Sequence, residues 1–318
     1  MKFKPLYHRL LSIKNPIHIM KAPVGNKRRL YFLFCLFFFS GYLSAQPYID
    51  IVQVRYTSSP DAGLHSDKNI KNNYQYFQAN ATLPYIFNKD SSMLVFTPFY
   101  EYYKITIASV TDLPDKVQSL ALPLNFVKPL SKRWGLTVGV IPRWNGYGSQ
   151  TFKSNSFQLG GLVLASVKKN DHLEYKFGLY YNSEFSGAFF VPLAGIDWQI
   201  NKRNALFGIL PGSLTYEHQV SKRFYCGGLF RAITNSYQAG YHDNTAISKY
   251  IRVDENQLGI FADTYLSKNI VFTTEFGHSV LRKLRFGEKD SKAPYYYKQK
   301  VNDNLYISAT VSYRLRVR

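Results

Sequence analysis

The last fourteen residues of the chain read Leu305-Tyr306-Ile307-Ser308-Ala309-Thr310-Val311-Ser312-Tyr313-Arg314-Leu315-Arg316-Val317-Arg318. The odd positions carry Leu, Ile, Ala, Val and one Tyr, whereas the even positions carry Ser, Thr, Arg and one Tyr. Because successive side chains of a β-strand point to opposite faces, this stretch predicts a strand with one apolar and one polar face. Soluble strands usually have about 5–6 residues, whereas a membrane-spanning β-strand needs about 9–11. The length therefore predicts a transmembrane strand that closes a β-barrel.

The same alternation recurs along the chain. The apolar sets are Phe77, Ala79, Ala81, Leu83, Tyr85 and Phe87; Trp134, Leu136, Val138, Val140 and Trp144; Leu173, Tyr175, Phe177, Leu179 and Tyr181; and Leu258, Ile260, Ala262, Thr264 and Leu266. Ten residues separate the two Trp side chains, which corresponds to about 25 Å of height in a strand tilted by about 40°. We expect these sets to face lipid, with Trp134, Trp144 and Tyr313 in the girdles at the membrane surfaces.

Short polar turns separate the predicted strands at intervals of one strand pair. They are residues 88–90, 131–133, 168–171, 201–203, 221–223 and 267–269, each of which follows an apolar residue. Asn, Asp and Ser suit tight hairpins because their side chains bond the local backbone. Longer connections are expected at 58–72, 109–116, 148–155, 184–188, 236–254 and 283–302, with a tight turn at 211–213.

These turns predict an all-β fold: a closed, antiparallel, up-and-down barrel of about fourteen strands, with short turns and both termini in the periplasm. Twelve strands are the alternative, because Pro211 and Gly212 leave only two short strands between residues 204 and 220.

The first 45 residues have the composition of a secretory signal peptide. They contain eight Lys or Arg and no acid, and an apolar run from Leu30 to Phe39 precedes small residues and Ala45. This pattern predicts cleavage after Ala45, export, and a barrel domain over residues 46–318 in the outer membrane. Cys226 would then be the one cysteine of the mature chain, so no internal disulfide is expected.

Removal of residues 1–45 lowers the net charge of the chain from +20 to +12. A soluble protein of this charge would suggest a nucleic-acid partner, but an exported chain does not meet nucleic acid. We expect outer-membrane lipids and lipopolysaccharide to supply the counter-charge. The basic residues from Arg282 to Lys300 form a candidate lipopolysaccharide-binding loop, with a solvated loop as the alternative.

Residues 46–318 resemble the outer-membrane β-barrel superfamily of Gram-negative bacteria, in particular small barrels known only as domains of unknown function. The resemblance is carried by the junction at Leu43-Ser44-Ala45-Gln46, the repeated Ser-Lys-Arg turns and the closing strand. It implies insertion by the barrel-assembly machinery. Many members of the superfamily end on an aromatic residue that this machinery reads, whereas this chain ends on Arg318.

Charged residues gather on the parity that should face the lumen. They are Glu101, Arg143, Glu174, Lys176, Asp197, Glu217, Arg231, Asp263, Glu275, Arg314 and Arg316. Charged rings inside a pore select solutes, so this set favours passive transport of small polar solutes through a charged lumen. The alternative is a non-conducting structural or surface-binding barrel, in which the charges neutralise one another.

An outer-membrane lipid-modifying hydrolase is a further alternative. His218 and His278 could lie on the outer surface, near Ser221 and Ser279 in sequence. Such an enzyme needs a hydrogen bond between nucleophile and base, and adjacent strand residues face opposite ways. We therefore expect no enzyme activity, no catalytic residues and no cofactor, and no spacing in the chain predicts a metal site.

Overall fold

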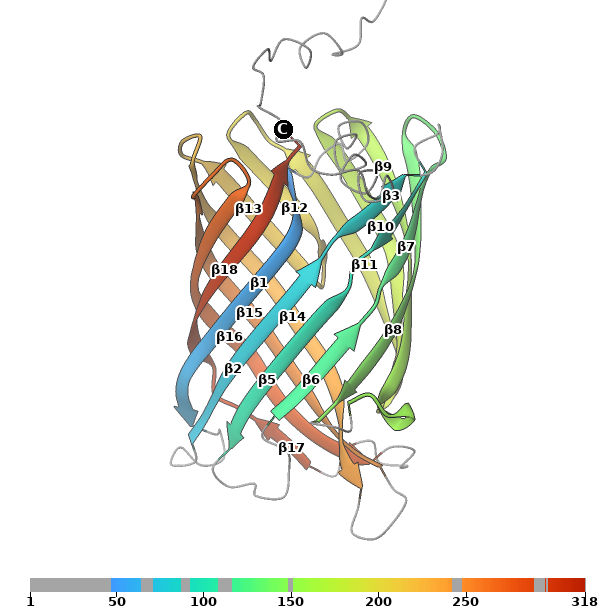
Figure 1. The fold of residues 1–318 in the computed structure, drawn as a ribbon, viewed down its shortest axis with the longest axis vertical. Coiled ribbons are helices and arrows are strands. Elements are labelled where there is room, and N and C mark those ends of the chain that lie inside the picture. Colours follow the sequence, from blue (N-terminus) through green and yellow to red (C-terminus); the bar gives the residue numbers. More distant parts are fainter. Residues whose placement is uncertain are drawn as a thin grey trace, which may run out of the picture. The chain divides into compact units, whose positions relative to one another are not determined.

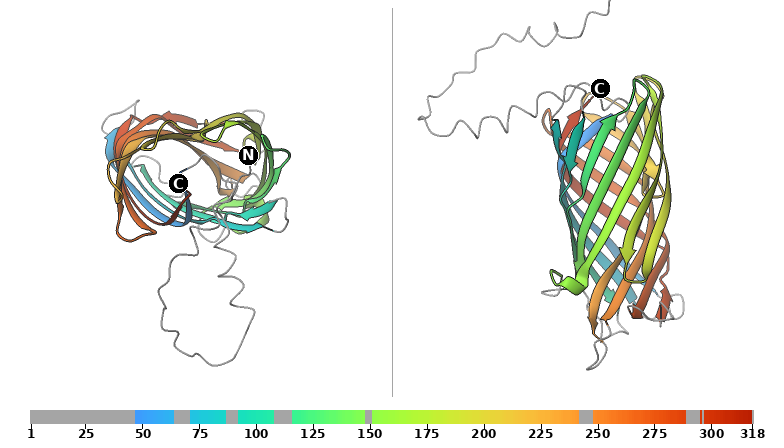
Figure 2. Two further views of the ribbon diagram at one scale, coloured as in Figure 1. Left: turned by 90° about the horizontal axis from the view of Figure 1, so that it is seen from above. Right: turned by 90° about the vertical axis from the view of Figure 1, so that its right-hand side faces the viewer.

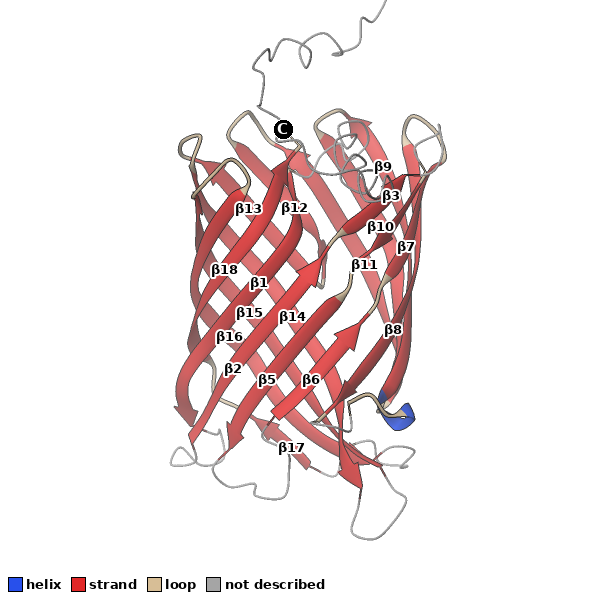
Figure 3. Ribbon diagram, in the orientation of Figure 1, coloured by secondary structure: helices blue, strands red, loops and turns tan. Residues whose placement is uncertain are grey.

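The computed structural model describes residues 47–63, 71–86, 92–107, 116–147, 151–241, 248–288, 295 and 297–317. The predicted signal peptide, its cleavage site and the predicted turn at 88–90 lie outside these residues. The regular elements of the described chain are β-strands and the short 3-10 helix η4 (Ser154–Ser156), joined by turns and loops (Figure 3). Within the same ranges, no helix has the length and apolarity needed to cross a membrane.

In the part of the chain that the structure describes, eighteen strand segments form one sheet in which every pairing is antiparallel. Their bounds are β1 (Tyr48–Gly63), β2 (Lys71–Ala81), β3 (Leu83–Ile86), β4 (Met93–Phe96), β5 (Phe99–Ile107), β6 (Lys116–Ala121), β7 (Leu124–Pro129), β8 (Trp134–Gly146), β9 (Phe157–Asn170), β10 (Leu173–Glu184), β11 (Gly187–Gln199), β12 (Asn204–Leu210), β13 (Ser213–Gln219), β14 (Phe224–Tyr241), β15 (Ser248–Tyr265), β16 (Ile270–Glu288), β17 (Tyr297–Lys300) and β18 (Asn304–Arg316). Four neighbouring pairs of segments, β2 with β3, β4 with β5, β6 with β7 and β17 with β18, each continue one wall strand. The wall therefore has fourteen strands, which confirms the prediction of fourteen over twelve.

The sheet closes between its first and last strands. β1 pairs with β18 from Tyr48↔Arg316 to Ser58↔Ile307, and β18 also pairs with β16. Figure 1 shows β18, in red, beside β1, in blue. The predicted closing strand is confirmed, and closure leaves neither terminal strand with a free edge, whose N–H and C=O groups would find no hydrogen-bond partner in lipid.

Three proline residues lie at one level in neighbouring wall strands. Pro98, Pro123 and Pro142 have no backbone N–H to give to the ladder, and strands tend to bend or break at such sites. Their carbonyl oxygens accept backbone N–H bonds from Ala81 (3.1 Å), Thr97 (3.0 Å) and Leu122 (2.9 Å) respectively. Pro98 and Pro123 explain the splits between β4 and β5 and between β6 and β7, whereas Pro142 lies within the unbroken strand β8, and β2 and β3 part at Thr82.

The two ends of the barrel differ. Short turns that join β7 to β8, β9 to β10, β11 to β12, β13 to β14 and β15 to β16 lie at the end that holds Pro47 and Val317, here named the turn end. The opposite end is named the loop end. Strands reach further toward it than predicted: β1 extends to Gly63, β14 to Tyr241 and β16 to Glu288, so the loops predicted at 58–72, 236–254 and 283–302 are wrong in extent. Long antiparallel pairings replace them.

The outward face is apolar and the inward face is mostly polar. In β18, Ile307 is 62 % exposed and Val311 50 %, whereas Thr310 and Ser312 are buried. Trp134, Ile260 and Tyr313 are likewise exposed on the outer face. The alternation that was read from the sequence thus follows the two faces of the wall.

Candidate functional site: the barrel lumen

The residues predicted to face the lumen lie on the inner face of the wall. Their polar contacts there include those of Glu101, Arg143, Lys176, Asp197, Glu217, Arg231, Asp263, Glu275, Arg314 and Arg316. Arg316 is bonded to Glu217, and Glu174 is 9 % exposed. The structure thus collects charges from most of the wall into a few clusters.

The cluster nearest the turn end is built on Arg316. Its guanidinium donates to both carboxylate oxygens of Glu217, at 3.0 and 2.7 Å, and to the hydroxyl of Tyr265 at 2.7 Å. The same guanidinium lies 3.5 Å from the ring centroid of Tyr225. A two-pronged ion pair against an aromatic face fixes both partners, so this cluster fills the lumen beside β13, β14 and β15.

Arg314 forms the next cluster. Nε donates to Asp50 at 2.6 Å, Nη1 donates to Asp263, and the guanidinium lies 3.6 Å from the ring centroid of Tyr48. Asp263 also accepts a bond from the hydroxyl of Thr273. One buried arginine therefore joins β1, β15 and β18 across the closure of the barrel.

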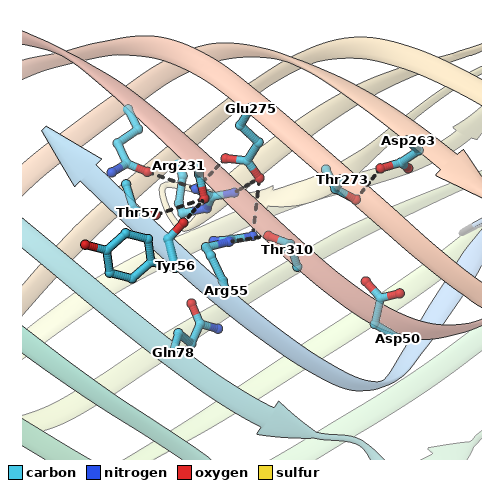
Figure 4. A network of polar contacts seen from close by, with 12 residues as sticks. Asp50, Arg55, Tyr56, Thr57, Gln78, Arg231, Asp263, Thr273, Glu275 and Thr310 are labelled. Carbon is cyan, nitrogen blue, oxygen red and sulfur yellow. Dashed lines mark hydrogen bonds and ion pairs between the residues drawn. The ribbon is translucent and has the colours of Figure 1, made fainter.

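The third cluster places two arginines on one carboxylate. Arg231 donates to Glu275 at 3.1 and 3.2 Å, and Arg55 lies 3.5 Å from the same carboxylate (Figure 4). A cavity of about 190 Å³ lies between this cluster and Arg314. Because its walls carry three arginines and three acids, the cavity is polar but close to neutral.

Two buried carboxylates organise the lumen toward the loop end. Glu255 accepts hydrogen bonds from the hydroxyls of Tyr74 (2.7 Å), Tyr103 (3.1 Å) and Ser279 (2.8 Å), and it lies 3.6 Å from the guanidinium of Arg282. The amide of Gln257 donates a further hydrogen bond to Glu255 at 2.8 Å. These five contacts hold the four strands β2, β5, β15 and β16 together around one acid.

Glu101 is the second of these carboxylates. It accepts hydrogen bonds from Tyr76 (2.9 Å), Tyr237 (2.8 Å) and Asn235 (2.6 Å), and Arg143 donates to the Asn235 side chain at 2.7 Å. β5, which carries Glu101, and β14, which carries Tyr237, are not neighbours in the wall. These bonds therefore run across the lumen.

Part of the β14–β15 hairpin leaves the wall and crosses the lumen. Wall strands alternate buried and exposed residues, as Phe261 (7 % exposed) and Ile260 (65 %) do in β15. Residues 236–239 of β14 and 250–253 of β15 are instead all buried, so both faces of the hairpin are covered there. These residues are named the crossing segment. Figure 2, left, shows strands inside the ring of the wall.

Contacts on both faces of β14 support this placement. On one face Tyr237 bonds Glu101 of β5. On the other, Ser236 donates to Glu184 of β10, its hydroxyl accepts from Gln158 of β9 at 3.0 Å, and its carbonyl accepts from Asn145 of β8 at 2.9 Å. A strand within the wall would contact only its two neighbours, so the crossing segment obstructs the lumen between β5 and β8–β10.

The lumen on the β8–β11 side contains a second cavity. It has a volume of about 220 Å³ and lies toward the turn end between the β7–β8 turn and strands β9 to β11. Its lining includes Lys168, Glu174 and the ion pair of Lys176 with Asp197 at 2.5 Å. The charged groups lie beside apolar side chains such as Met93, Val127 and Leu164, so the lining of this cavity is mixed.

The serine and histidine side chains considered for a hydrolase do not pair. Nδ1 of His218 bonds the side chain of Asn204 at 2.7 Å, and Nδ1 of His278 contacts the backbone oxygen of Ser279 at 3.1 Å. The hydroxyl of Ser279 points inward to Glu255, while Ser221 caps its own turn through the N–H of Arg223. Within the described ranges no group of acidic, His or Cys side chains could hold a metal ion.

Comparison with known proteins places the chain in a family. Residues 53–314 match the model of a domain of unknown function (DUF6268). The chain belongs to this family. Together with the closed barrel, the match confirms the predicted resemblance to small barrels of undefined function. No curated protein matches the chain.

Several solved structures are similar to the chain over most of its length. An outer membrane channel from Pseudomonas putida F1 is 8 % identical, with a TM-score of 0.43 and coverage of 86 % of this chain and 98 % of that one. A Pseudomonas aeruginosa FadL homologue is 11 % identical, with a TM-score of 0.45 and coverage of 84 % of this chain and 90 % of that one. The NanC porin is 9 % identical, with a TM-score of 0.37 and coverage of 83 % of this chain and 100 % of that one. These identities are too low to carry over a solute.

Sequence reasoning missed part of the site. Asp50, Arg55, Glu184, Arg252 and Glu255 join the inner clusters without having been predicted. One signal was present: on the parity that is apolar from Leu258 to Leu266, the chain carries Arg252, Asp254 and Asn256. Polar residues on a lipid-facing parity indicate that this half of the strand has left the lipid.

Proposed function

We propose that this DUF6268 protein is an outer-membrane channel for passive transport of small polar solutes, described here in a closed conformation. The observation that supports this most directly is the crossing segment. A polar lumen runs through the barrel, and the β14 edge of the hairpin, which side-chain hydrogen bonds hold against β5 and β8–β10, obstructs it, while β15 stays paired with β16. Location in the outer membrane is part of the proposal, and the apolar outer face supports it.

The crossing segment is suited to a gate because it lies outside the ladder of the wall on one side. β14 pairs with β13 only from Ser213↔Arg231 to Gln219↔Tyr225, and from Asn235 onward it pairs with β15 alone. Side-chain hydrogen bonds contribute about 0.5–1.5 kcal/mol each, or about 1.5–3 kcal/mol where a charged group accepts, whereas opening the wall would break a whole ladder. Moving the β14 edge away from β5 and β8–β10 therefore breaks side-chain bonds, and the pairing of β15 with β16 can act as the hinge.

Planar-bilayer conductance of the purified full chain tests the proposal. The Ser236→Ala/Tyr237→Phe variant removes the hydroxyls that bond Glu184 and Glu101, and we expect it to open more often than the wild type. Thr57→Val is the matched control, because it removes a buried hydroxyl bond of 2.9 Å to Ser308 within the wall. Equal and negligible conductance in all three proteins, at normal insertion, would contradict a channel.

A non-conducting structural barrel is the second candidate. It is favoured by the interior beside β1 and β13–β18, where Arg314, Arg316 and Arg231 are each bonded to carboxylates. In that case the clusters serve stability alone. Swelling of protein-containing liposomes in small sugars separates the two candidates, since only a channel lets the sugars enter.

A further inference from the structure

The barrel wall is incomplete between β11 and β14 in its loop-end half. β11 pairs with β12 only from Ala194 to Gln199, and β14 pairs with β13 only from Tyr225 to Arg231. Beyond these points, in the described chain, residues 187–193 have β10 as their one strand partner and residues 233–241 have β15. The cause is the shortness of β12 and β13, which have seven residues each and turn at Pro211-Gly212.

The gap is wide and lies at the depth of the apolar outer face. At the tip of the β12–β13 hairpin, β11 and β14 are three strand spacings apart, about 14 Å. Seven residues of β11 beyond the tip cover about 17 Å of height at a tilt of about 40°. At this level Phe190 of β11 is 59 % exposed and its ring lies 5.0 Å from that of Tyr181 on the lipid-facing side of β10. The gap thus opens toward lipid.

The crossing segment passes behind the gap rather than filling the wall. It contacts the far edge from inside: Arg252 donates to the hydroxyl of Ser186 at 3.4 Å and lies 4.9 Å from the ring centroid of Phe189, while Tyr250 stacks on Phe185 at 6.2 Å. The outward parity of β14 and β15 just past the tip presents Thr234 and Asp254, which are joined by a hydrogen bond of 3.4 Å, and Asp254 is also ion-paired with Arg252 and Arg285, each at 3.2 Å. The gap therefore has a polar floor.

The rim of the gap is apolar. Phe190 lies on the β11 edge, and Leu210, at the tip of β12, is 39 % exposed. Backbone N–H and C=O groups on the two unpaired strand edges need partners, because an unsatisfied group in hydrocarbon costs several kcal/mol. Irregular edges at membrane depth persist only where they line protein or a polar cavity. An apolar rim can bind an acyl chain and a polar floor can bind a head group, so the gap has the polarity that an amphiphilic molecule requires.

We propose that this gap, named the side window, is a binding site that takes single-chain amphiphiles from the outer leaflet, with the head group on Thr234 and Asp254 and the tail against Phe190 and Leu210. The site is distinct from passage along the barrel axis, so it does not rest on the proposed channel function.

Thiol labelling in lipid vesicles tests the side window. In a Cys226→Ser background, Thr234→Cys is exposed to a maleimide carried on an acyl chain within phosphatidylcholine vesicles. Thr264→Cys, on the exposed outer face of β15, is the positive control, and Thr273→Cys, buried on the inner face, is the negative control. We expect Thr234→Cys to react roughly tenfold or more faster than Thr273→Cys, because a buried thiol reacts only through local opening.

Competition identifies the ligand class. Dodecylphosphocholine should slow labelling of Thr234→Cys and leave that of Thr264→Cys unchanged. If Thr234→Cys does not fold, Ala232→Cys, next to the tip on the same parity, takes its place. Labelling no faster than at Thr273→Cys would overturn the side window, and labelling that dodecylphosphocholine does not slow would overturn the amphiphile as its ligand.

Discussion

The two halves of the β14–β15 hairpin share one continuous ladder and have opposite surroundings. Toward the turn end, the hairpin is part of the wall, with Ile260 exposed to the outside and Asp263 buried inside. Toward the loop end, the same strands are buried on both faces and carry polar groups on both, such as Ser236 and Tyr237. The pairing of β14 with β15 is therefore the same in the wall and in the obstruction. The two halves differ in the loss of β13 as a second neighbour of β14, and in the polarity of the outward parity.

Removal of β18 should have the largest effect, because every wall strand depends on closure. Truncation after Asn304 leaves β1 and β16 with free edges in lipid, where unpaired backbone groups cost several kcal/mol each. We expect the truncated chain to be absent from the outer-membrane fraction and to show no heat-dependent shift in gel mobility. Normal insertion would mean that the wall does not close through β1 and β18.

Arg314→Ala tests the wall from its interior. The substitution leaves Asp50 and Asp263 buried without their cation, and loss of one partner from a buried ion pair costs about 3–5 kcal/mol. Urea unfolding in lipid vesicles should show a loss of this size, and Asp263→Asn in the same chain should restore part of it. Unchanged stability would show that the arginine cluster does not support the wall.

Glu184→Gln tests the crossing segment from its far side. Ser236 loses a charged acceptor, so we expect a loss of about 1–2 kcal/mol, smaller than for Arg314→Ala, together with more frequent channel openings. Lys176→Met, which breaks an ion pair with Asp197 on the same side of the lumen, is the matched control for charge. If the channels of both variants open equally often, the crossing segment does not act as the gate.

Thr57→Val should have the smallest effect. It removes one neutral bond to Ser308 between β1 and β18, worth about 1 kcal/mol, and leaves the ladder of the closure intact. Urea unfolding should detect this loss, while conductance stays at the wild-type value. A larger loss of unfolding free energy than for Glu184→Gln would contradict the expectation that this bond in the wall matters less than the contact of the crossing segment with Glu184.

Alternation predicted the wall, the closing strand, the short turns and the inward direction of residues such as Arg314 and Glu275. Counting by parity fails wherever the register shifts. A shift between Asp50 and Val52 places Asp50 and Arg55 on the same inner face despite their opposite parity. Arg282 lies just past Leu281, whose φ is 56°, at the shift between β15 and β16.

The crossing segment could not be predicted from alternation for a different reason. Parity tells which face of a sheet a residue occupies, but not whether that face contacts lipid, the lumen or another part of the protein. Between residues 236 and 254 both parities carry polar residues, which is typical of a solvated loop as well as of a strand inside a polar lumen. Only the long pairing of β14 with β15, and their contacts with β5 and β8–β10, separate the two.

The most direct test of the central claim is cross-linking between β14 and β9. In a regular wall these strands would be five spacings apart, about 24 Å, whereas here the side chains of Ser236 and Gln158 lie 3.0 Å apart. In a Cys226→Ser background, Gln158→Cys/Ser236→Cys should be joined by a short bifunctional thiol reagent as readily as Thr57→Cys/Ser308→Cys, whose residues lie on paired strands. Modification of both cysteines without a link, in protein that shows the gel shift of a folded barrel, would contradict a hairpin that crosses the lumen.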